Sequence, residues 1–343
     1  MENRHRDWEL RQMQNLPLKL KIQKTRRRIK EWYDHFDGGA YLSFSGGKDS
    51  TVLRDIVLKM RLNIPSVYID TGLEYPEVRK FAIENADVVL RPEMNFRQVI
   101  LTYGYPVISK EIAQCIQDAR KGLKRGDGSY SYPIKKLQGL CTKKDGTLSS
   151  YNHKKWAFML DAPFSISAQC CKVMKKAPAK KYEKETGRHP MIATMACESA
   201  LRRQRWLRYG CNAFNDKERP ASNPISFWTE NDVLHYLWRY KAPYASIYGE
   251  IHCRYNGKEC PDRAARRCLD EYPESESKFE FYTTGVDRTG CMFCAFGAHL
   301  EDHPNRFQRM KETHPKQYDY CMRPVDRGGL GMAEVLDYAG IEH

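Results

Sequence analysis

The stretch Ala40-Tyr41-Leu42-Ser43-Phe44-Ser45-Gly46-Gly47-Lys48-Asp49-Ser50 decides the fold. Its first five residues are mostly apolar, as in a buried strand, and Thr51–Met60 has the apolar spacing of a helix. Gly46 and Gly47 lack a Cβ and let backbone N–H groups approach an anion at the positive end of that helix. The Walker spacing G-x-x-x-x-G-K-[ST] is absent. We therefore expect a strand–loop–helix unit that binds an anion; an ordinary Gly-Gly turn is the alternative.

Outward from this unit, short apolar segments alternate with segments of helical spacing. The predicted strands and helices are Ser66–Asp70, Pro76–Asn85, Val88–Leu90, Met191–Met195 and Glu198–Tyr209. This alternation is typical of a doubly wound α/β fold with a parallel sheet, which binds its ligand at the carboxyl ends of the strands. The predicted domains are a helical basic arm (1–36), a nucleotide-binding domain (37–223) with a basic mobile loop (122–155), and a cysteine-rich C-terminal portion (224–343) with an insertion (252–282).

The composition indicates a globular protein of the cytoplasm with anionic partners. At 343 residues the chain can bury a sizeable core, and no run approaches the ~18 apolar residues that span a bilayer. The first residues, MENRHRDWEL, lack the apolar region of a secretory signal, so we expect the twelve cysteines to be thiols or metal ligands. The net charge of +14 favours nucleotides or nucleic acids as partners, and no membrane.

The loop Ser45–Ser50 resembles the PP-loop of ATP pyrophosphatases, and Asp70-Thr71-Gly72-Leu73-Glu74 resembles the second signature of the phosphoadenosine phosphosulfate (PAPS) reductase family, a branch of these enzymes. Gly104–Pro106 with Ser109 and Lys110 is similar to a further family segment, as is Trp228–Val233. The resemblance implies an adenine nucleotide alpha-hydrolase-like fold that binds ATP or adenylyl sulfate, with Mg²⁺. Lys48 and Asp49 are the catalytic candidates. The implied nucleotide site is Ser43, Ser45, Gly46, Gly47, Lys48, Asp49, Ser50, Asp70, Thr71, Gly72, Lys110, Glu198 and Arg202.

Glu198 and Arg202 follow a predicted strand and open a basic helix, which is a natural anion site. The segment Thr194–Ser199 resembles one that contacts the anionic end of the nucleotide, but the family often has Arg where Met195 stands. Recognition of a sulfate or a 3′-phosphate therefore stays open, and a solvated helix face is the alternative.

Cysteines form a second constellation. Cys170 and Cys171 are adjacent, and Cys291 and Cys294 form a C-x-x-C, which suits zinc or an iron–sulfur cluster. Adjacent thiolates cannot both face one small ion without strain, whereas a cubane offers irons at separate corners. The pattern resembles the four-cysteine [4Fe–4S] site of assimilatory adenylyl-sulfate reductases and of sulfur-transfer enzymes of DNA phosphorothioation. Zinc and buried thiols are the alternatives, and nearby cations are expected from Lys172, Lys175, Lys176 and Arg288.

Two further groups of thiols are weaker candidates. His252, Cys253, Cys260 and Cys268 lie in the insertion, but their spacing fits no standard zinc module. Sulfonucleotide reductases carry a nucleophilic cysteine near the C-terminus in a Glu-Cys-Gly-like tail. Here Cys321 is the only late candidate, and its setting does not resemble that tail.

Three functions fit these features. The first is ATP-dependent adenylation of an acceptor, with nucleic acid one candidate, followed by transfer of sulfur from a persulfide on a partner or on the cluster. The second is an adenylyl-sulfate or phosphoadenylyl-sulfate reductase that releases sulfite, with Cys321 or another thiol as nucleophile. The third is a binding protein that senses the nucleotide or the cluster. The first two require a sulfur or thiol donor protein, and the sequence leaves the oligomeric state open.

Overall fold

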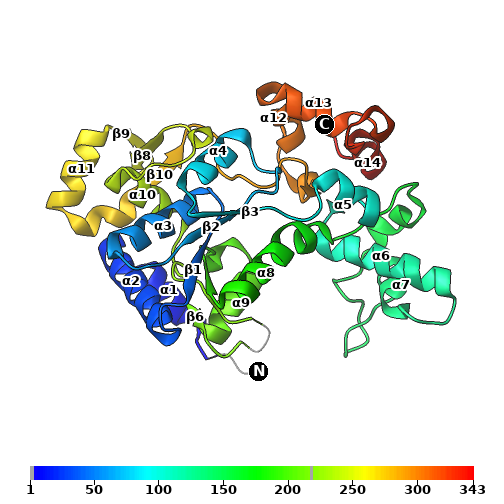
Figure 1. Ribbon diagram of the computed structural model, residues 1–343, viewed down its shortest axis with the longest axis horizontal. Coiled ribbons are helices and arrows are strands. Elements are labelled where there is room, and N and C mark those ends of the chain that lie inside the picture. The colour runs from blue at the N-terminus through cyan, green and yellow to red at the C-terminus, as the bar shows by residue number, and fades with distance from the viewer. Residues whose placement is uncertain (1–3, 217–218) are drawn as a thin grey trace. The chain divides into compact units, whose positions relative to one another are not determined.

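The computed structural model describes residues 4–216 and 219–343 and has the predicted α/β fold with a largely parallel central sheet (Figure 1). The chain forms two compact units, each built from several segments. The first contains the residues up to Asp70, Glu74–Leu90 and Ala179–Thr289, and the second contains Thr71–Leu73, Arg91–Pro178 and Gly290–His343. The chain therefore passes between the units more than once, whereas the prediction placed contiguous boundaries at residues 36 and 223. The first three residues of the predicted arm lie outside the described residues.

The first unit holds a six-stranded sheet in the order β3-β2-β1-β5-β7-β6. All neighbouring strands are parallel except β6 and β7, which are antiparallel. The strands are β1 (Ala40–Phe44), β2 (Ser66–Ile69), β3 (Val88–Leu90), β5 (His189–Ile192), β6 (Asn212–Ala213) and β7 (Ala221–Ser222). The chain leaves β1 toward β2 on one side, and β5 lies on the other, so the strand order reverses at β1. An open α/β sheet binds ligands at such a point, outside the carboxyl ends of its strands.

Both faces of β1 are covered, which explains its nearly continuous apolar sequence. Leu42 and Phe44 point into the main core with Trp32. Tyr41 points to the opposite face, where it packs with Val67 and Tyr182. The alternation of side chains along a strand thus separates two apolar layers.

Three helices of the first unit, at residues 48–60, 76–85 and 200–209, lie where the alternation predicted helices. The full set in this unit is α1 (Asp7–Gln14), α2 (Leu18–His35), α3 (Lys48–Met60), α4 (Pro76–Asn85), α8 (Ala177–Thr186, which begins in the second unit), α9 (Ala200–Tyr209), α10 (Glu230–Tyr240), α11 (Asp262–Glu271) and the short 3₁₀ helices η3 (Ala196–Glu198), η4 (Ser246–Tyr248) and η5 (Pro273–Lys278). The predicted insertion at 252–282 forms an antiparallel sheet in the order β10-β8-β9 together with α11. Its strands are β8 (Ile251–Tyr255), β9 (Lys258–Cys260) and β10 (Phe279–Thr283).

The second unit is mainly helical. Its only sheet within the described residues is the parallel pair β4 (Val107–Ile108) and β11 (Ala295–Phe296). Its helices are α5 (Phe96–Tyr103), α6 (Lys110–Arg125), α7 (Ser131–Gln138), α12 (Arg306–Thr313), α13 (Pro315–Met322), α14 (Met332–Ala339), the π-helix η2 (Lys172–Lys176) and the 3₁₀ helices η1 (Lys154–Asp161), η6 (Ala298–Leu300) and η7 (Val325–Arg327). The segment 122–155, predicted as an irregular loop, contains helix α7.

Over residues 4–216 and 219–343, no helix combines the length and the apolar character needed to cross a bilayer. The cytoplasmic location stays a prediction.

Candidate functional site

Gly46 seats the loop after β1 against helix α4. Its φ of +73° lies in the region that favours glycine, and a Cβ there would lie 2.9 Å from the Ala82 side chain and from the Val78 carbonyl oxygen. Gly47 has an ordinary φ of −73° and is the N-cap of α3. The close packing on α4 therefore requires glycine at 46, while the loop itself opens the N-terminus of a 13-residue helix.

Hydroxyl groups hold the loop in shape. Ser50 Oγ donates to the Gly47 carbonyl (2.9 Å) and accepts from the Ser45 backbone N–H (3.2 Å). Thr51 Oγ1 donates to the same Gly47 carbonyl (3.0 Å). Ser43, also predicted to belong to the site, lies half-buried within β1. The loop's own hydroxyl groups therefore support its shape.

Lys48 is buried at the start of α3 and paired on two sides. Its Nζ donates to the Glu230 carboxylate and to the Asp287 backbone carbonyl. The Tyr248 ring centroid lies 5.8 Å from Nζ, and the Tyr248 hydroxyl bonds to Thr289 Oγ1 (2.6 Å). An ammonium group held this way is in place at the loop, and an entering anion would compete with Glu230 for it.

Asp49 lies beside Lys48 with its carboxyl largely buried. Burial raises the pKa of Asp49 to about 6; Lys48 opposes this shift, while Glu198 and Glu230 add to it. Its buried Oδ1 has no hydrogen-bond partner among the described residues. An orphaned, buried carboxylate oxygen is one oxygen ligand of the kind that Mg²⁺ takes.

Glu198 links the start of α9 to this loop. Its carboxylate accepts from the Met195 backbone N–H (2.7 Å), pairs with Arg202, and lies 4.0 Å from Arg288. Arg288 also pairs with Glu230 (3.4 Å). Glu198 and Arg202 therefore join the loop's charge network, and their binding to a nucleotide stays a prediction. Arg288, expected near the cysteines, pairs with Glu198 and Glu230 in the first unit.

Asp70 ends strand β2 and is buried. Its carboxylate accepts two hydrogen bonds from Arg79 of α4, at 2.7 and 2.8 Å. Thr71 and Gly72 belong to the second unit, where Thr71 Oγ1 accepts from the Leu73 backbone N–H (3.3 Å). Gly72 has a φ of +69° and open space around it. Their predicted part in the nucleotide site stays a prediction.

The four predicted cluster cysteines all lie in the second unit. Cys170 and Cys171 stand just before η2, with their Sγ atoms 4.0 Å apart. The hydrogen bond from Cys170 lowers the pKa of Cys171, and Lys110 and Lys175 lower it further. That hydrogen bond and burial raise the pKa of Cys170, as do the charges of Cys294 and Cys291. Two of the predicted site residues, Lys110 and Cys171, are thus brought together.

Cys291 and Cys294 close a tight turn, in which the Cys294 N–H donates to the Cys291 carbonyl (3.2 Å). Burial raises the pKa of Cys294 to about 11, and the charges of Cys291 and Cys171 add to this. The four thiols are therefore close enough to interact electrostatically, from two segments that are far apart in sequence.

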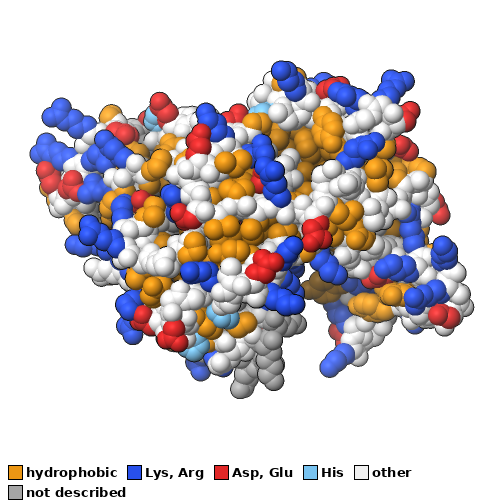
Figure 2. All heavy atoms as spheres, viewed as in Figure 1, with side chains coloured by type: hydrophobic (Ala, Val, Ile, Leu, Met, Phe, Trp, Pro, Cys, Tyr) orange, Lys and Arg blue, Asp and Glu red, His pale blue; other side chains and the backbone are white. Residues whose placement is uncertain are grey.

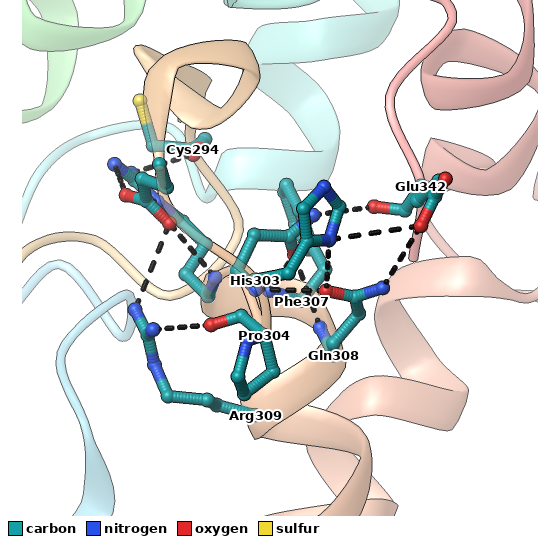
Figure 3. Close-up of polar contacts among 10 residues, drawn as sticks. Cys294, His303, Pro304, Phe307, Gln308, Arg309 and Glu342 are labelled. Atoms are coloured by element: carbon teal, nitrogen blue, oxygen red, sulfur yellow. Dashed lines mark hydrogen bonds and ion pairs between the residues drawn. The ribbon is translucent and has the colours of Figure 1, made fainter.

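A polar network anchors the chain after this turn. Arg306 donates to the Cys294 carbonyl (2.9 Å) and pairs with Glu301. Figure 3 shows Cys294 at one end of this network, with His303 and Gln308 reaching Glu342 at the other. The C-terminal helices of the second unit thus fix the position of Cys294.

In the described part of the chain, no three or more Cys, His, Asp or Glu side chains are arranged to hold a metal ion. This applies to the insertion as well, where Cys253 faces Cys260 across β8 and β9. The four thiolates of a [4Fe–4S] cluster bind four different irons, so they lie further apart than the ligands of one ion. The donor set of four thiols with Lys110 and Lys175 beside it fits such a cluster by its chemistry.

Cys321, the nucleophile of the reductase hypothesis, is fully buried in α13, and burial raises its pKa. A thiolate rather than a thiol is the nucleophile, so this environment disfavours attack on a substrate. Its catalytic role stays a prediction that its burial argues against.

The phosphoadenosine phosphosulfate reductase domain model matches residues 39–99 and 139–295, more than half of the chain. The match contains the loop, Glu198, Glu230 and all four cluster cysteines. The chain belongs to the phosphoadenosine phosphosulfate reductase family.

Two individual proteins are similar to this chain at low sequence identity. An uncharacterized protein of Methanocaldococcus jannaschii is 24% identical over 258 residues, which are 74% of this chain and 43% of that protein. The chain thus spans less than half the length of this curated relative. The crystal structure of phosphoadenylyl-sulfate reductase from Candida auris in a phosphate complex covers 72% of this chain and 92% of its own, with 13% identity and a TM-score of 0.36. A likeness that slight carries no argument about function.

The PAPS reductase family is enzymatic, and its domain in this chain supports a role related to nucleotides and sulfur at a coarse level. Sequence reasoning did not include Tyr248, Asp287 and Thr289 in the site. These residues follow the loop by some 200 to 240 positions, and no local pattern marks them. Glu230 lay in a segment recognised as similar to the family, which was the available signal.

Proposed function

We propose that this member of the PAPS reductase family adenylates an acceptor with ATP and then transfers sulfur to it, with nucleic acid as the acceptor class. The observation that carries the choice over a reductase is the burial of Cys321. A reductase needs an accessible thiolate to attack the sulfur of a sulfonucleotide. The adenylating route needs no such thiolate, and the loop at β1 offers the charges that it does need.

In the first step, an acceptor oxygen attacks the α-phosphorus of ATP, and the bond to pyrophosphate breaks. Negative charge develops on the departing pyrophosphate, and in this proposal the loop N–H groups and Lys48 stabilise it. In the second step, a hydrosulfide attacks the carbon that bears the adenylated oxygen. A C–S bond forms, the C–O bond breaks, and AMP leaves with the acceptor oxygen. This exchange is balanced without an oxidant or a reductant.

Lys48 must change partners for the first step. Its ammonium is held by Glu230 and the Asp287 carbonyl, and polyphosphate would displace Glu230. Glu230 keeps Arg288 as its second partner, so its carboxylate is not left unpaired. The pairing thus keeps Lys48 in place until nucleotide enters.

Asp49 is the residue that would hold a magnesium ion at the loop. Its buried, unpartnered Oδ1 and its raised pKa both favour a bound cation. The ion would add positive charge beside the polyphosphate. Without the ion, the ionised Asp49 carboxylate would repel the nucleotide.

Cys170, Cys171, Cys291 and Cys294 are the residues that would hold a [4Fe–4S] cluster. When bound, such a cluster supplies irons that accept electrons or bind sulfur. This chain's own part is the thiolate set and the charges of Lys110 and Lys175, which lower the pKa of Cys171. Anaerobically purified protein should contain about four iron and four sulfide per chain; zinc in their place would contradict the assignment.

Exchange of radiolabelled pyrophosphate into ATP tests the adenylation step without a sulfur donor. We expect exchange only when acceptor is added, with heat-denatured bulk DNA and bulk RNA as the two probes. The Lys48→Met variant is the control and should not exchange. Absence of exchange with both probes, together with sulfite released from adenylyl sulfate by the wild-type protein, would replace this function with the reductase.

A further inference from the structure

The segment Lys121–Phe158 of the second unit is unusually basic and exposed. It carries nine Lys and Arg against two Asp, a net charge of +7, which is half of the net charge of the whole chain. The family match leaves residues 100–138 uncovered, so the first part of this segment is not accounted for by the family domain. The nucleotide loop and the cysteine site do not use it.

Most of the charge in this segment is free to meet a partner. Five of its lysines are exposed, and no acidic side chain of the described residues pairs with them: Lys124, Lys135, Lys143, Lys144 and Lys154. Figure 2 shows Lys and Arg side chains interspersed with exposed hydrophobic side chains over α6 and α7. A surface of this kind attracts a polyanion.

Exposed aromatic rings accompany the lysines. Tyr132 and Tyr151 are 60% and 65% exposed, which is high for such large rings. Lys136 Nζ lies 5.6 Å from the centroid of Tyr132 and 5.9 Å from that of Tyr151. The ammonium therefore holds both rings in place through cation–π contacts while much of each ring stays open.

This tyrosine pair is attached to helix α6 near its first turn. Lys136 pairs with Glu111 (2.6 Å), and His153 lies 3.3 Å from the same carboxylate. The residue before Glu111 is Lys110, whose positive charge acts on the Cys171 thiol. The rings are thus fixed on the same helix turn as a residue of the cysteine site.

We propose that the segment Lys121–Phe158 binds single-stranded nucleic acid, with bases stacked on Tyr132 and Tyr151 and with the exposed lysines on the phosphates. Unstacked bases offer π-faces to such rings, whereas duplex bases are stacked on one another. Two rings held by one cation suit neighbouring bases better than a lipid surface, because the exposed apolar side chains here are spread over α6, α7, η1 and the loops between them rather than along one helix. The inference that this segment docks the acceptor rests on the proposed function. The binding itself does not require turnover.

Fluorescence anisotropy of a labelled 20-nucleotide single strand, as DNA and as RNA, tests the surface with the full-length protein. Tyr132→Ala/Tyr151→Ala should weaken binding by at least ~25-fold, from about fivefold per stacked base. Lys143→Gln/Lys144→Gln/Lys154→Gln should reduce the slope of log K against log salt by about 2, from ~0.7 per phosphate contact. The matched control is Tyr272→Ala/Lys258→Gln, which changes exposed residues of the first unit and should leave binding unchanged.

Three results would overturn the proposal: equal binding by the tyrosine variant and the control, tighter binding of a hairpin duplex of the same sequence, or preference for vesicles of phosphatidylserine and phosphatidylcholine over the strand. Failure of the proposed function looks different. Strand binding that depends on Tyr132 and Tyr151, with no pyrophosphate exchange, would keep the surface and remove the adenylation chemistry. Exchange with an acceptor other than nucleic acid, without strand binding, would keep the adenylation chemistry and remove the binding surface.

Discussion

Replacing Asp49 by Asn should stabilise the metal-free protein while removing its activity. Burial raises the pKa of this carboxyl from its ordinary 3.8 to about 6, so the ionised form is disfavoured in the folded state. The difference between these values corresponds to about 3 kcal/mol of unfolding free energy. The penalty is absent below pH 3.8, grows as pH rises, and is complete above pH 6.

The difference between two pH values isolates this effect, because any cost of the buried Asn amide is the same at both. At pH 4.5 the penalty is only about 1 kcal/mol. The gain in unfolding free energy of Asp49→Asn over the wild type should therefore be about 2 kcal/mol larger at pH 8 than at pH 4.5. Urea unfolding in EDTA, followed by tryptophan fluorescence, measures this gain. Five of the six tryptophans lie in the first unit, where Asp49 is.

Asp34→Asn is the matched control, because Asp34 lies in the same unit but is 53% exposed in a surface pair with Lys30. Its effect should stay within about 0.5 kcal/mol at both pH values. A gain for Asp49→Asn that is equal at the two pH values, or larger at pH 4.5, would refute the buried-carboxylate reasoning. At pH 8 the variant should also lose magnesium-dependent turnover of ATP.

Three further outcomes follow from the same structure. Lys48→Met should lower the rate of ATP turnover by about 10²-fold, as for loss of one group that stabilises transition-state charge; a change of less than threefold in a steady-state assay would contradict its role. Cys321→Ala should leave turnover within twofold of wild type, because the thiol is a core group; loss of sulfite formation in this variant, with its circular dichroism unchanged, would instead favour the reductase. Burial lowers the pKa of His235 to about 3, so the folded state holds it neutral and stability falls as pH drops below about 6.5. When the pH falls from 7.5 to 5, the His235→Phe variant should therefore lose about 2 kcal/mol less unfolding free energy than the wild type, as measured by urea unfolding. Equal losses in the two proteins would exclude His235 as the cause.

The elements nearest the loop could be predicted almost to the residue. The strand Ala40–Phe44 and the helix Pro76–Asn85 have the predicted bounds, because a short apolar run and an N-terminal proline mark them locally. The strand predicted at Met191–Met195 instead runs from His189 to Ile192. Strand ends depend on pairing with a neighbour, and here β1 pairs with β5 only over those residues.

The site itself could be predicted only in part. Sequence reasoning selects Glu198 and Arg202, which lie among the loop's charges, but the partners of Lys48 come from positions 230 and 287. Such contacts arise from the packing of α10 and the segment after β10, which periodicity does not report. Arg288 is expected near the cysteines because an anionic cluster attracts cations. It pairs with Glu230 and Glu198, and its role beside the cysteines stays a prediction.

The most direct test of the proposed function is product analysis of cluster-loaded protein under anaerobic, reducing conditions. ATP, adenylyl sulfate and its 3′-phosphorylated form are offered separately, each with sulfide and with denatured bulk DNA or bulk RNA. The account predicts AMP and pyrophosphate from ATP only when nucleic acid is present, with both sulfonucleotides left intact. Sulfite formed from either sulfonucleotide, with ATP untouched, would contradict it.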